Sequence, residues 1–481
     1  MMKKVLVANR SEIACRVFQA CREMGLGTVA IYAPGDEQAR HVTYADQVEK
    51  VSSYLDVDAV IAAAQRSGAQ LIHPGYGFLS ERPAFVDAVE KAGLIFVGPT
   101  SDTMRKMGDK VGSKELAQKM GVPILPWAKV EKGGDLKAQA KKVGFPLLLK
   151  ASAGGGGKGM RRVDREADLD AAAESAAQEA KSAFGDGTLF LEKLVEKPRH
   201  IEVQVFGDGR GGAVHLMDRE CSLQRRHQKI WEEAPAPRLS DKTRNGLHEA
   251  ALQLSKGVNY RSAGTLEFLV DADGEFYFLE MNARLQVEHP VTEQVTGVDL
   301  VHAQLQLALN PSSSPLKEAP PARGHSIEVR LYAEDPFQGF IPTPGTVTKL
   351  HWPTGTGIRV ESGIEEGQAI GIQFDSMVAK LVVHAQDRDQ ALARMRFALE
   401  ETVLLGVGTN QAYLRQLCDH PAVKKAEVYT QFLEREFAQA AEPNPSEEAL
   451  QLLIQASASV TVPVSVTDSS TESFPSPWRT V

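Results

Sequence analysis

Apolar and polar residues alternate through the stretch Leu279–Glu293, which reads LEMNARLQVEHPVTE. If its first half is an extended strand, the polar side chains share one face, because side chains alternate across a strand. Those polar residues are Glu280, Asn282, Arg284, Gln286 and Glu288. The residues between them, Met281, Leu285 and Val287, are apolar and suit a buried face. A strand at the solvated edge of a sheet alternates in the same way, so the pattern alone leaves both interpretations open.

Short apolar runs and helical patterns alternate in the first quarter of the chain. The runs KVLVA, TVAIYA, LIHPGYGFLSE and LIFVGP, which begin at residues 4, 28, 71 and 94, each predict a strand. A helix is expected from about Ser11, a residue type that caps helices well. Strands that alternate with helices indicate a parallel α/β sheet, and we expect this domain to end near residue 113.

A second α/β unit is predicted around a run of glycines. The strand LLLKA at 147–151 leads into glycines at 154–157, and an Ala- and Glu-rich helix follows at about 166–184. The apolar run at 189–195 and the alternating residues at 200–208 predict two more strands. The unit is therefore expected to be small and to carry a glycine-rich hairpin.

The second half of the chain predicts a hairpin, a connector and a mixed α+β domain. The segment 264–281 predicts a hairpin closed by a DADG turn. A Pro- and Ser-rich connector at 311–324 precedes short strands, such as GTVTKL at 345–350, and the helix RDQALARMRFALEET. The tail 439–481 becomes rich in Ser and Thr, so we expect it to be linker-like and poorly ordered.

Composition excludes several classes of protein. The 481 residues exceed one usual hydrophobic core, and 43% hydrophobic with 24% charged residues is typical of a soluble globular protein. A net charge of −8 gives no bulk attraction to nucleic acid or to an anionic membrane, and no apolar run is long enough to span one. Four cysteines without a CxxC pair fit a reducing compartment. We expect a cytoplasmic protein, or one of the mitochondrial matrix if a transit segment is missing.

The glycine run GGGGKGM at 154–160 is a candidate phosphate loop. It is not a Walker A loop, because Ser152 takes the place of the first glycine and Gly159 follows the lysine. Nor does a convincing dinucleotide-binding βαβ unit surround it. A flap whose backbone N–H groups close over phosphates fits better, with Lys150 and Lys158 nearby. A plain flexible loop is the alternative.

Three oxygen-bearing side chains suggest a divalent metal site. Glu267 lies on one strand of the predicted hairpin, and Glu280 and Asn282 lie on the other. Pairing of the two strands would bring these hard oxygen ligands together, and Mg²⁺ with nucleotide phosphates takes such ligands. The absence of a His or Cys cluster beside them disfavours zinc. A satisfied polar network is the alternative.

The basic run CSLQRRHQK at 221–229 would by itself fit a solvated surface, but it belongs to a recognisable series. In order, the motifs are HPGYGFLSE, KASAGGGGKGMR, EKPRHIEVQV, ECSLQRRHQKIWEEAPAP, GTLEF, EMNARLQVEHPVTE and RLYAEDP. The series closely resembles biotin carboxylase, an ATP-grasp enzyme, over about residues 2–438.

The resemblance implies a fold of class α/β and α+β with three domains. They are an N-terminal Rossmann-like (pre-ATP-grasp) domain at 1–113, an ATP-grasp domain at 114–323 with a glycine-rich lid at about 125–196, and a C-terminal mixed α+β domain at 324–438. The implied reaction converts ATP, bicarbonate and a biotinyl carrier to ADP, phosphate and N-carboxybiotin.

The resemblance also implies a role for individual residues. The implied ATP-binding residues are Lys110, Lys150, Gly155, Gly156, Gly157, Glu192, Lys193, Val195, His200, Gln224 and His227. Glu267, Glu280 and Asn282 match the Mg²⁺ or Mn²⁺ ligands. The bicarbonate pocket would comprise Lys229, Arg284, Gln286 and, through its backbone N–H, Val287.

Glu288 matches the general base and Arg330 the cation that stabilises the biotin enolate, so Glu288, Arg330, Arg284 and Lys229 are the expected catalytic residues. Bicarbonate is a poor electrophile, and ATP first phosphorylates it to carboxyphosphate. Cations must therefore gather two anions that repel each other, while a base removes the bicarbonate proton.

Partners follow from the resemblance as well. The chain has no AMKM-type biotinyl-lysine motif, so we expect biotin to arrive as a substrate on a separate carrier domain or protein. Tyr332 in RLYAEDP resembles acyl-CoA carboxylase α chains, which suggests the biotin carboxylase part of a longer α chain, with a carboxyltransferase subunit and a homodimer or larger complex. Pyruvate or urea carboxylase, a carbamoyl-phosphate-synthetase-like ligase and a silent nucleotide-binding module are the alternatives.

Four residues depart from the commonest family pattern. Ser11 replaces the glycine of NRGEIA, Arg82 an asparagine, Trp127 a glycine and Thr343 a serine. None is among the expected chemical residues, so we expect these changes to affect local turn geometry or subunit contacts rather than activity.

Overall fold

The structure is a computed structural model that describes residues 2–130, 134–152, 160–438 and 440–441. The chain divides into two units, Met1–Ala440 and Ala441–Val481, and every described helix and strand lies in the first. The expected phosphate-loop residues Gly155, Gly156 and Gly157 and the tail 442–481 lie outside the described residues. None of the helices in these ranges combines the length and the apolar composition of a bilayer-crossing helix.

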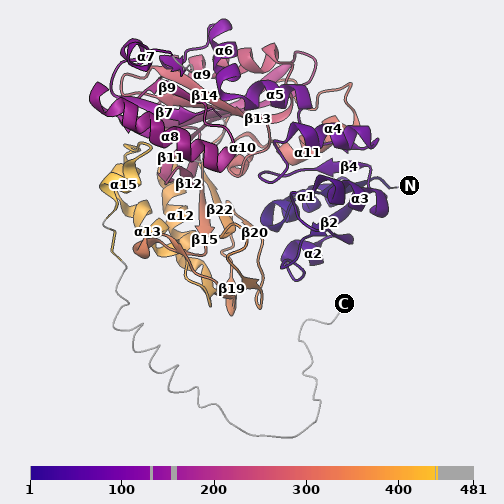
Figure 1. Ribbon diagram of the computed structural model, residues 1–481. Helices are drawn as coiled ribbons and strands as arrows, with labels where there is room; N and C mark the ends of the chain where they lie inside the picture. The colour runs from indigo at the N-terminus through magenta and orange to yellow at the C-terminus, as the bar shows by residue number, and fades with distance from the viewer. Residues whose placement is uncertain (1, 131–133, 153–159, 439, 442–481) are drawn as a thin grey trace, which may run out of the picture. The chain divides into compact units, whose positions relative to one another are not determined.

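The N-terminal residues form a five-stranded parallel sheet of order β3-β2-β1-β4-β5, which confirms the predicted α/β architecture (Figure 1). Its strands are β1 (Lys4–Val7), β2 (Gly27–Tyr32), β3 (Gln47–Lys50), β4 (Leu71–His73) and β5 (Ile95–Phe96). The helices are α1 (Ser11–Glu23), α2 (Arg40–Tyr44), α3 (Val57–Ser67), α4 (Pro83–Lys91) and α5 (Ser101–Gly108). The central strands are almost uninterrupted apolar runs because both of their faces are buried.

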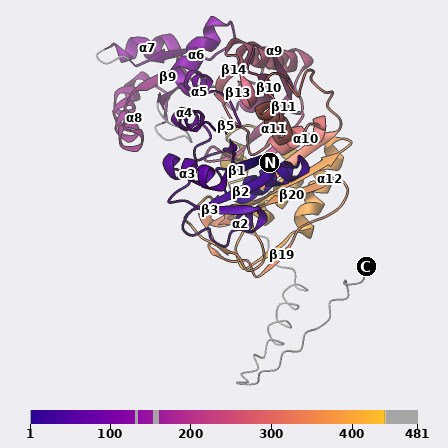
Figure 2. The same cartoon turned by 90° about the vertical axis from the view of Figure 1, so that its right-hand side faces the viewer.

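A four-stranded sheet of order β6-β9-β7-β8 follows, with its own hydrophobic core. Its strands are β6 (Trp127–Lys129), β7 (Leu147–Ala151), β8 (Arg161–Val163) and β9 (Leu189–Lys193). The helices of this region are α6 (Lys110–Lys119), α7 (Leu136–Val143), the short η1 (Glu166–Asp168) and α8 (Leu169–Phe184). In both views α7 and α8 lie on the outside of the first unit (Figures 1 and 2).

The largest sheet has eight strands in the order β14-β13-β10-β11-β12-β15-β22-β20. They are β10 (Arg199–Asp208), β11 (Ala213–Arg225), β12 (Gln228–Ala234), β13 (Arg261–Val270), β14 (Phe276–Asn282), β15 (His325–Tyr332), β20 (Ile358–Ser362) and β22 (Met377–Ala385). The helices along this part of the chain are α9 (Asp241–Gly257), α10 (His289–Thr296) and α11 (Leu300–Leu309). Because β12 pairs with β15, one antiparallel sheet joins the strands before and after the connector 311–324.

The C-terminal part completes its core with helices and short strand pairs. The helices are η2 (Pro336–Gln338), α12 (Arg388–Glu401), α13 (Gln411–Asp419), α14 (Pro421–Lys424) and α15 (Phe432–Glu436). The short strands are β16 (Glu334–Asp335), β17 (Ile341–Pro342), β18 (Gly345–Thr346), β19 (Lys349–His351), β21 (Ala369–Ile370) and β23 (Val403–Leu405). The predicted single strand at 345–350 is therefore wrong: β18 pairs with β21, whereas β19 pairs with β23.

Two further local predictions need correction. The hairpin of β13 and β14 forms as predicted, but β14 ends at Asn282, so Arg284 and Gln286 lie in a loop and Glu288 is the N-cap of α10. The five polar residues therefore do not share one strand face. Ser11 is the first helical residue rather than the cap, and its φ of 61° lies in the left-handed region that favours glycine.

Candidate active site

Two cavities receive most of the expected site residues. A cavity of about 270 Å³, named here the nucleotide cavity, is lined by every expected ATP-binding residue that the structure describes and by both expected metal carboxylates. These residues are Lys110, Lys150, Glu192, Lys193, Val195, His200, Gln224, His227, Glu267 and Glu280. A second cavity of about 500 Å³, the acceptor cavity, is lined by Arg284, Val287 and Arg330 among others.

A row of charged side chains crosses four neighbouring strands of the large sheet. Arg219 on β11 pairs in register with Glu202 on β10, Glu202 with Glu267 on β13, and Glu267 with Glu280 on β14. Residues opposite each other in a sheet project from the same face, so the pairing builds one continuous charged row. The site is thus organised across strands, and β14 contributes only its end.

The expected metal ligands meet at the outer end of this row. Asn282 donates a hydrogen bond from Nδ2 to Glu267 Oε1 over 2.8 Å, and His200 Nε2 lies 3.2 Å from Glu267 Oε2. Burial raises the pKa of Glu280, and the neighbouring charge of Glu267 adds to this effect. Two carboxylates that destabilise each other's charge, with an amide beside them, fit a divalent cation that prefers oxygen ligands.

Lys229 forms ion pairs with three carboxylates in the next part of the site. Its Nζ lies 2.6 Å from Glu202 Oε2, 3.0 Å from Glu267 Oε1 and 2.7 Å from Glu288 Oε1. Although burial alone would lower the pKa of Lys229, the three carboxylates raise it well above its usual range. Lys229 therefore remains charged, and it connects the nucleotide cavity to Glu288.

Glu288 is the N-cap of α10 and is held between two cations. Besides Lys229, Arg330 donates from NH2 to Glu288 Oε2 over 2.9 Å, and the carboxyl group is almost fully buried. Burial would raise the pKa of Glu288, but the charges of Lys229, Arg330 and Arg219 lower it well below its usual range. The side chain is consequently a carboxylate at neutral pH, the form that a general base requires.

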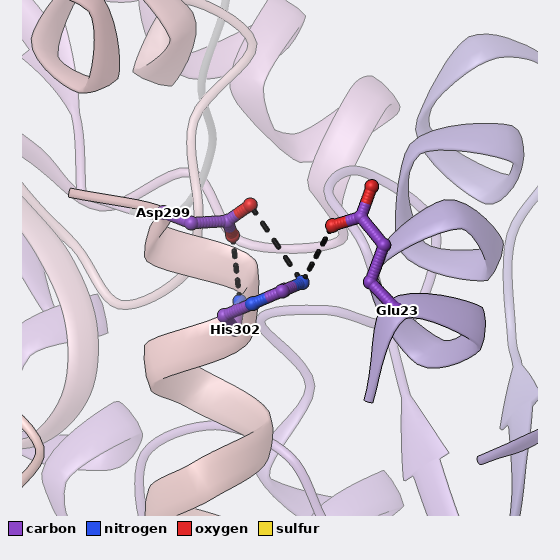
Figure 3. A group of neighbouring side chains, drawn as sticks. All are labelled: Glu23, Asp299 and His302. Atoms are coloured by element: carbon purple, nitrogen blue, oxygen red, sulfur yellow. Dashed lines mark hydrogen bonds and ion pairs between the residues drawn. The ribbon is translucent and has the colours of Figure 1, made fainter. Parts of the chain in front are cut away.

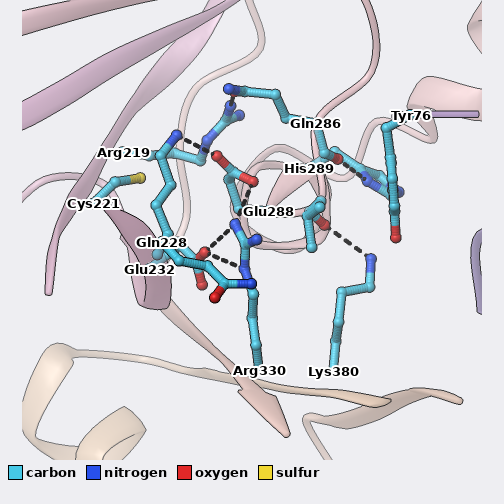
Figure 4. Close-up of polar contacts among 12 residues, drawn as sticks. Tyr76, Arg219, Cys221, Gln228, Glu232, Gln286, Glu288, His289, Arg330 and Lys380 are labelled. Carbon is cyan, nitrogen blue, oxygen red and sulfur yellow. Dashed lines mark hydrogen bonds and ion pairs between the residues drawn. The ribbon is translucent and has the colours of Figure 1, made fainter. Parts of the chain in front are cut away.

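Arg330 is positioned by a second carboxylate. Glu232 on β12 accepts a hydrogen bond of 2.7 Å from Arg330 Nε, so Glu232 and Glu288 fix the guanidinium from two sides (Figure 4). Burial raises the pKa of Glu232 to about 7; the charge of Arg330 opposes this shift, and that of Glu288 reinforces it. Arg330 lines the acceptor cavity and is therefore a fixed cation beside that space.

The remaining expected bicarbonate residues are tied into the same network. Arg284 donates from Nε to Glu81 Oε2 over 2.8 Å and from NH2 to Asn282 Oδ1 over 2.9 Å. Gln286 donates to Glu267 over 2.9 Å and accepts from Arg219 over 2.8 Å. The carbonyl oxygen of Val287 accepts a hydrogen bond of 2.8 Å from Lys380; the expected role of its N–H group stays a prediction.

Several residues of the network were not identified from sequence, namely Glu81, Lys114, Glu202, Arg219, Glu232 and Lys380. Arg219 is fully buried and donates hydrogen bonds to five side-chain oxygens, one of them Glu202 Oε1 at 2.5 Å. For the four of these residues that lie on strands, a charged residue inside an apolar strand was the available signal, because a buried charge needs partners.

A cluster of one histidine and two carboxylates outside both cavities has the residue types of a metal site. His302 Nε2 lies 3.0 Å from Glu23 and 3.9 Å from Asp299, which joins α1 to the start of α11 (Figure 3). Asp299 already accepts the backbone N–H of His302 and lies 2.7 Å from Arg16, while Glu23 accepts a hydrogen bond from Gln19. These internal partners account for the cluster as a bridge between two helices.

Comparison with known families covers nearly the whole described chain. Residues 1–104 match the family "Biotin carboxylase, N-terminal domain", residues 109–316 "Carbamoyl-phosphate synthase L chain, ATP binding domain", and residues 328–435 "Biotin carboxylase C-terminal domain". The three matches follow one another in the order that the resemblance implies.

Individual relatives agree. The chain is 45% identical to the biotin carboxylase of Pseudomonas aeruginosa, covering 90% of this chain and 98% of that protein. It is 44% identical to the mitochondrial methylcrotonoyl-CoA carboxylase subunit alpha of Dictyostelium discoideum, covering 99% of this chain and 70% of that subunit. Two other α subunits are covered over only 60% and 61% of their length.

A solved structure shares the fold. The biotin carboxylase domain dimer of the Hydrogenobacter thermophilus 2-oxoglutarate carboxylase, in complex with MgADP, ADP and bicarbonate, superposes with a TM-score of 0.88 at 43% identity. The match covers 92% of this chain and all of that domain. The chain therefore belongs to the biotin carboxylase family of ATP-grasp enzymes and is an ATP-dependent ligase.

Proposed function

We propose that the chain carboxylates the biotin of a carrier, using ATP and bicarbonate, through the residues that join the two cavities. The observation that carries this proposal is the position of Lys229, whose Nζ contacts Glu267 of the nucleotide cavity and also Glu288. Glu288 in turn contacts Arg330, which lines the acceptor cavity. A single chain of ion pairs thus runs from the nucleotide cavity to the acceptor cavity.

The nucleotide cavity would hold ATP. Lys110 and Lys150 line it and would bind phosphates. Glu192 and Lys193 at the end of β9, with Val195 just after the strand, would hold the adenine ring. Glu267, Glu280 and Asn282 would hold Mg²⁺ or Mn²⁺, which when bound would offset the phosphate charge. The related domain of the 2-oxoglutarate carboxylase is in complex with MgADP, which supports the same cofactor here.

Bicarbonate would be phosphorylated between the cavities. Lys229 contacts Glu288, Gln286 contacts Glu267, and Arg284 contacts Asn282. Together with Val287, which precedes Glu288 in the chain, these residues would hold the anion next to the γ-phosphate. Glu288 would accept the bicarbonate proton as its oxygen attacks phosphorus, giving ADP and carboxyphosphate. An incoming anion would draw Lys229 away from Glu288 and so raise the basicity of that carboxylate.

Arg330 would act in the second step. Carboxyphosphate would break down to CO₂ and phosphate, and the phosphate would take the N1 proton of biotin. The negative charge that develops on the ureido oxygen needs a fixed cation in a site that excludes water. The guanidinium of Arg330, held by Glu232 and Glu288 beside the acceptor cavity, suits this role.

The larger assembly is part of the proposal. We infer that a separate carrier domain or protein delivers the biotin and that a carboxyltransferase subunit consumes the carboxybiotin, as the first half-reaction of an acyl-CoA carboxylase. Similarity to methylcrotonoyl-CoA carboxylase α subunits supports this assignment, and the dimer of the related domain supports a homodimer. Similarity to a pyruvate carboxylase subunit leaves pyruvate as the alternative final acceptor.

The test is phosphate release from ATP by the purified chain. We expect turnover that requires bicarbonate and Mg²⁺ and that free biotin stimulates. Residues 109–316 match a carbamoyl-phosphate synthase ATP-binding domain, so a ligase that forms carbamoyl phosphate is the main alternative function. If biotin does not stimulate turnover and the chain forms carbamoyl phosphate when ammonia is added, that alternative function would replace the proposed one.

A further inference from the structure

Two lysines share one buried carboxylate in the nucleotide cavity. Glu192 on β9 is fully buried; its Oε1 forms an ion pair with Lys114 on α6, and its Oε2 forms one with Lys150 on β7. Both oxygens of the carboxylate are therefore occupied by a cation. Burial alone would raise the pKa of Glu192, but the two lysines lower it to about 2, so the carboxylate stays ionised at neutral pH.

The two lysines differ in what else they can reach. The side chain of Lys114 is only 3% exposed, and Glu192 is its one described ion-pair partner. The side chain of Lys150 is 16% exposed, and it precedes Ala151 and Ser152 at the end of β7, where the glycine run begins. Both lysines line the nucleotide cavity, but Lys150 is the more exposed of the two and is thus better placed to turn toward a bound phosphate.

Moving Lys150 to a phosphate has an electrostatic consequence. A buried carboxylate that loses its only cation is strongly destabilised, because neither water nor a counter-charge compensates it. If Glu192 depended on Lys150 alone, ATP binding would have to break that ion pair and leave the carboxylate uncompensated. With Lys114 in place, Glu192 keeps a partner when Lys150 leaves.

We propose that Lys114 is a positioning residue for ATP binding: it is the permanent counter-ion of Glu192 and thereby frees Lys150 to bind the phosphates of ATP. This inference rests on the proposed phosphate-binding role of Lys150. Lys114 acts through Glu192 and needs no contact with the nucleotide. Its effect should therefore disappear when the carboxylate is removed.

The test is a double-mutant cycle of bicarbonate-dependent ATP cleavage by the full chain. Lys114→Met keeps the length of the side chain and removes the charge, so Lys150 must serve Glu192 alone. We expect the KM for ATP to rise about tenfold or more while kcat changes less than threefold. Lys114→Arg, which keeps the cation, should recover most of the affinity. Lys119→Met is the matched control, because Lys119 is an exposed lysine on the same helix.

The decisive variant combines Lys114→Met with Glu192→Gln. This pair replaces both charges with neutral groups of similar size, which is less disruptive than leaving one charge unpaired. Glu192→Gln alone is the reference, because Glu192 itself lines the nucleotide cavity, and we expect adding Lys114→Met to change its KM for ATP by less than about threefold. If Lys114→Met raises the KM for ATP as much in the Glu192→Gln background as in the wild type, Lys114 acts independently of Glu192 and the inference would be wrong.

The outcomes also separate this inference from the proposed function. A wild-type chain without bicarbonate-dependent ATP cleavage would remove the proposed function itself. An active wild-type chain whose Lys114→Met variant keeps the wild-type KM would overturn only the role of Lys114. If Lys114→Met does not fold, as judged by its thermal transition, two variants still decide: Lys114→Arg must bind ATP nearly normally, and the double variant must bind ATP as well as Glu192→Gln alone.

Discussion

The nucleotide end and the acceptor end of the site are built on opposite charge arrangements. At the nucleotide end, Lys114 and Lys150 share the single carboxylate of Glu192. In the network that leads to the acceptor cavity the carboxylates predominate: three of them, including Glu267 of the nucleotide cavity, surround Lys229, and two hold Arg330. The nucleotide end has one more cation than its carboxylate requires, whereas the cations at the acceptor end are already paired with carboxylates.

This difference indicates how each end handles an anion. Spare cations can attract phosphates directly, so the nucleotide end should control affinity for ATP. A closed network must exchange one partner for the substrate, which fixes the catalytic groups in place before substrate binds. The acceptor end should therefore control the chemical steps. Variants at that end test this division.

The largest expected effect comes from Glu288→Gln. The variant removes the base but leaves Lys229 with Glu202 and Glu267, and Arg330 with Glu232, so neither cation is left unpaired. We expect bicarbonate-dependent ATP hydrolysis to fall by about 100-fold or more, with ATP affinity kept within about threefold. Phosphate release and nucleotide titration measure the two quantities, with the exposed Glu249→Gln as a control. Unchanged turnover would remove Glu288 from the role of base.

Arg330→Ala should separate the two chemical steps. The lost guanidinium contributes to the charge that develops on biotin, so we expect biotin carboxylation to fall by about 100-fold and biotin-independent ATP cleavage to fall much less. Carboxybiotin formation and phosphate release are measured on the same samples. Arg330→Lys keeps a charge but not the two-sided geometry, and should be intermediate. Equal loss of both activities would argue against a specific role toward biotin.

Glu232→Gln should change how stability depends on pH. In the folded protein the pKa of Glu232 is raised to about 7 from an ordinary value of 4.5. The protonated form of Glu232 therefore contributes its full share of folding stability below about pH 4.5, and this contribution is lost as the pH rises through about 7. Relative to the wild type, the variant should gain about 2 kcal/mol of unfolding free energy between pH 5 and 8. Urea unfolding at both pH values measures this, and a constant difference would contradict the raised pKa.

Local pattern and motif chemistry predicted one end of the charged row better than the rest. The DADG turn joins the two strands and sets the register of their hairpin. Sequence therefore predicted that Glu267, Glu280 and Asn282 would lie close together. Glu202 and Arg219 reach the row through pairing of other strands. Such pairing depends on packing of the whole sheet, and alternation within one strand does not reveal it.

The end of β14 shows the same limit. Alternation correctly predicted a strand, but the chain leaves the sheet after Asn282, and Glu288 reaches its place as the cap of a helix. The proline after His289 marks this helix start, because proline favours the first helical turn. Sequence could have located the break at this point, whereas the contacts of Glu288 with β12 and β15 needed the structure.

The smallest expected effect concerns a strained turn near the acceptor end and is conformational rather than electrostatic. Ser11 has a φ of 61°. A Cβ built on Gly363 would lie 1.8 Å from Ser11 Oγ, so these two segments of the chain approach closely. Ser11→Gly should raise the free energy of unfolding by about 0.5 to 1 kcal/mol, because glycine adopts this backbone without strain. Ser11→Ala removes the hydroxyl but keeps the Cβ and should gain little. Thermal unfolding compares the two variants; an equal gain would assign the effect to the crowded hydroxyl instead of the backbone.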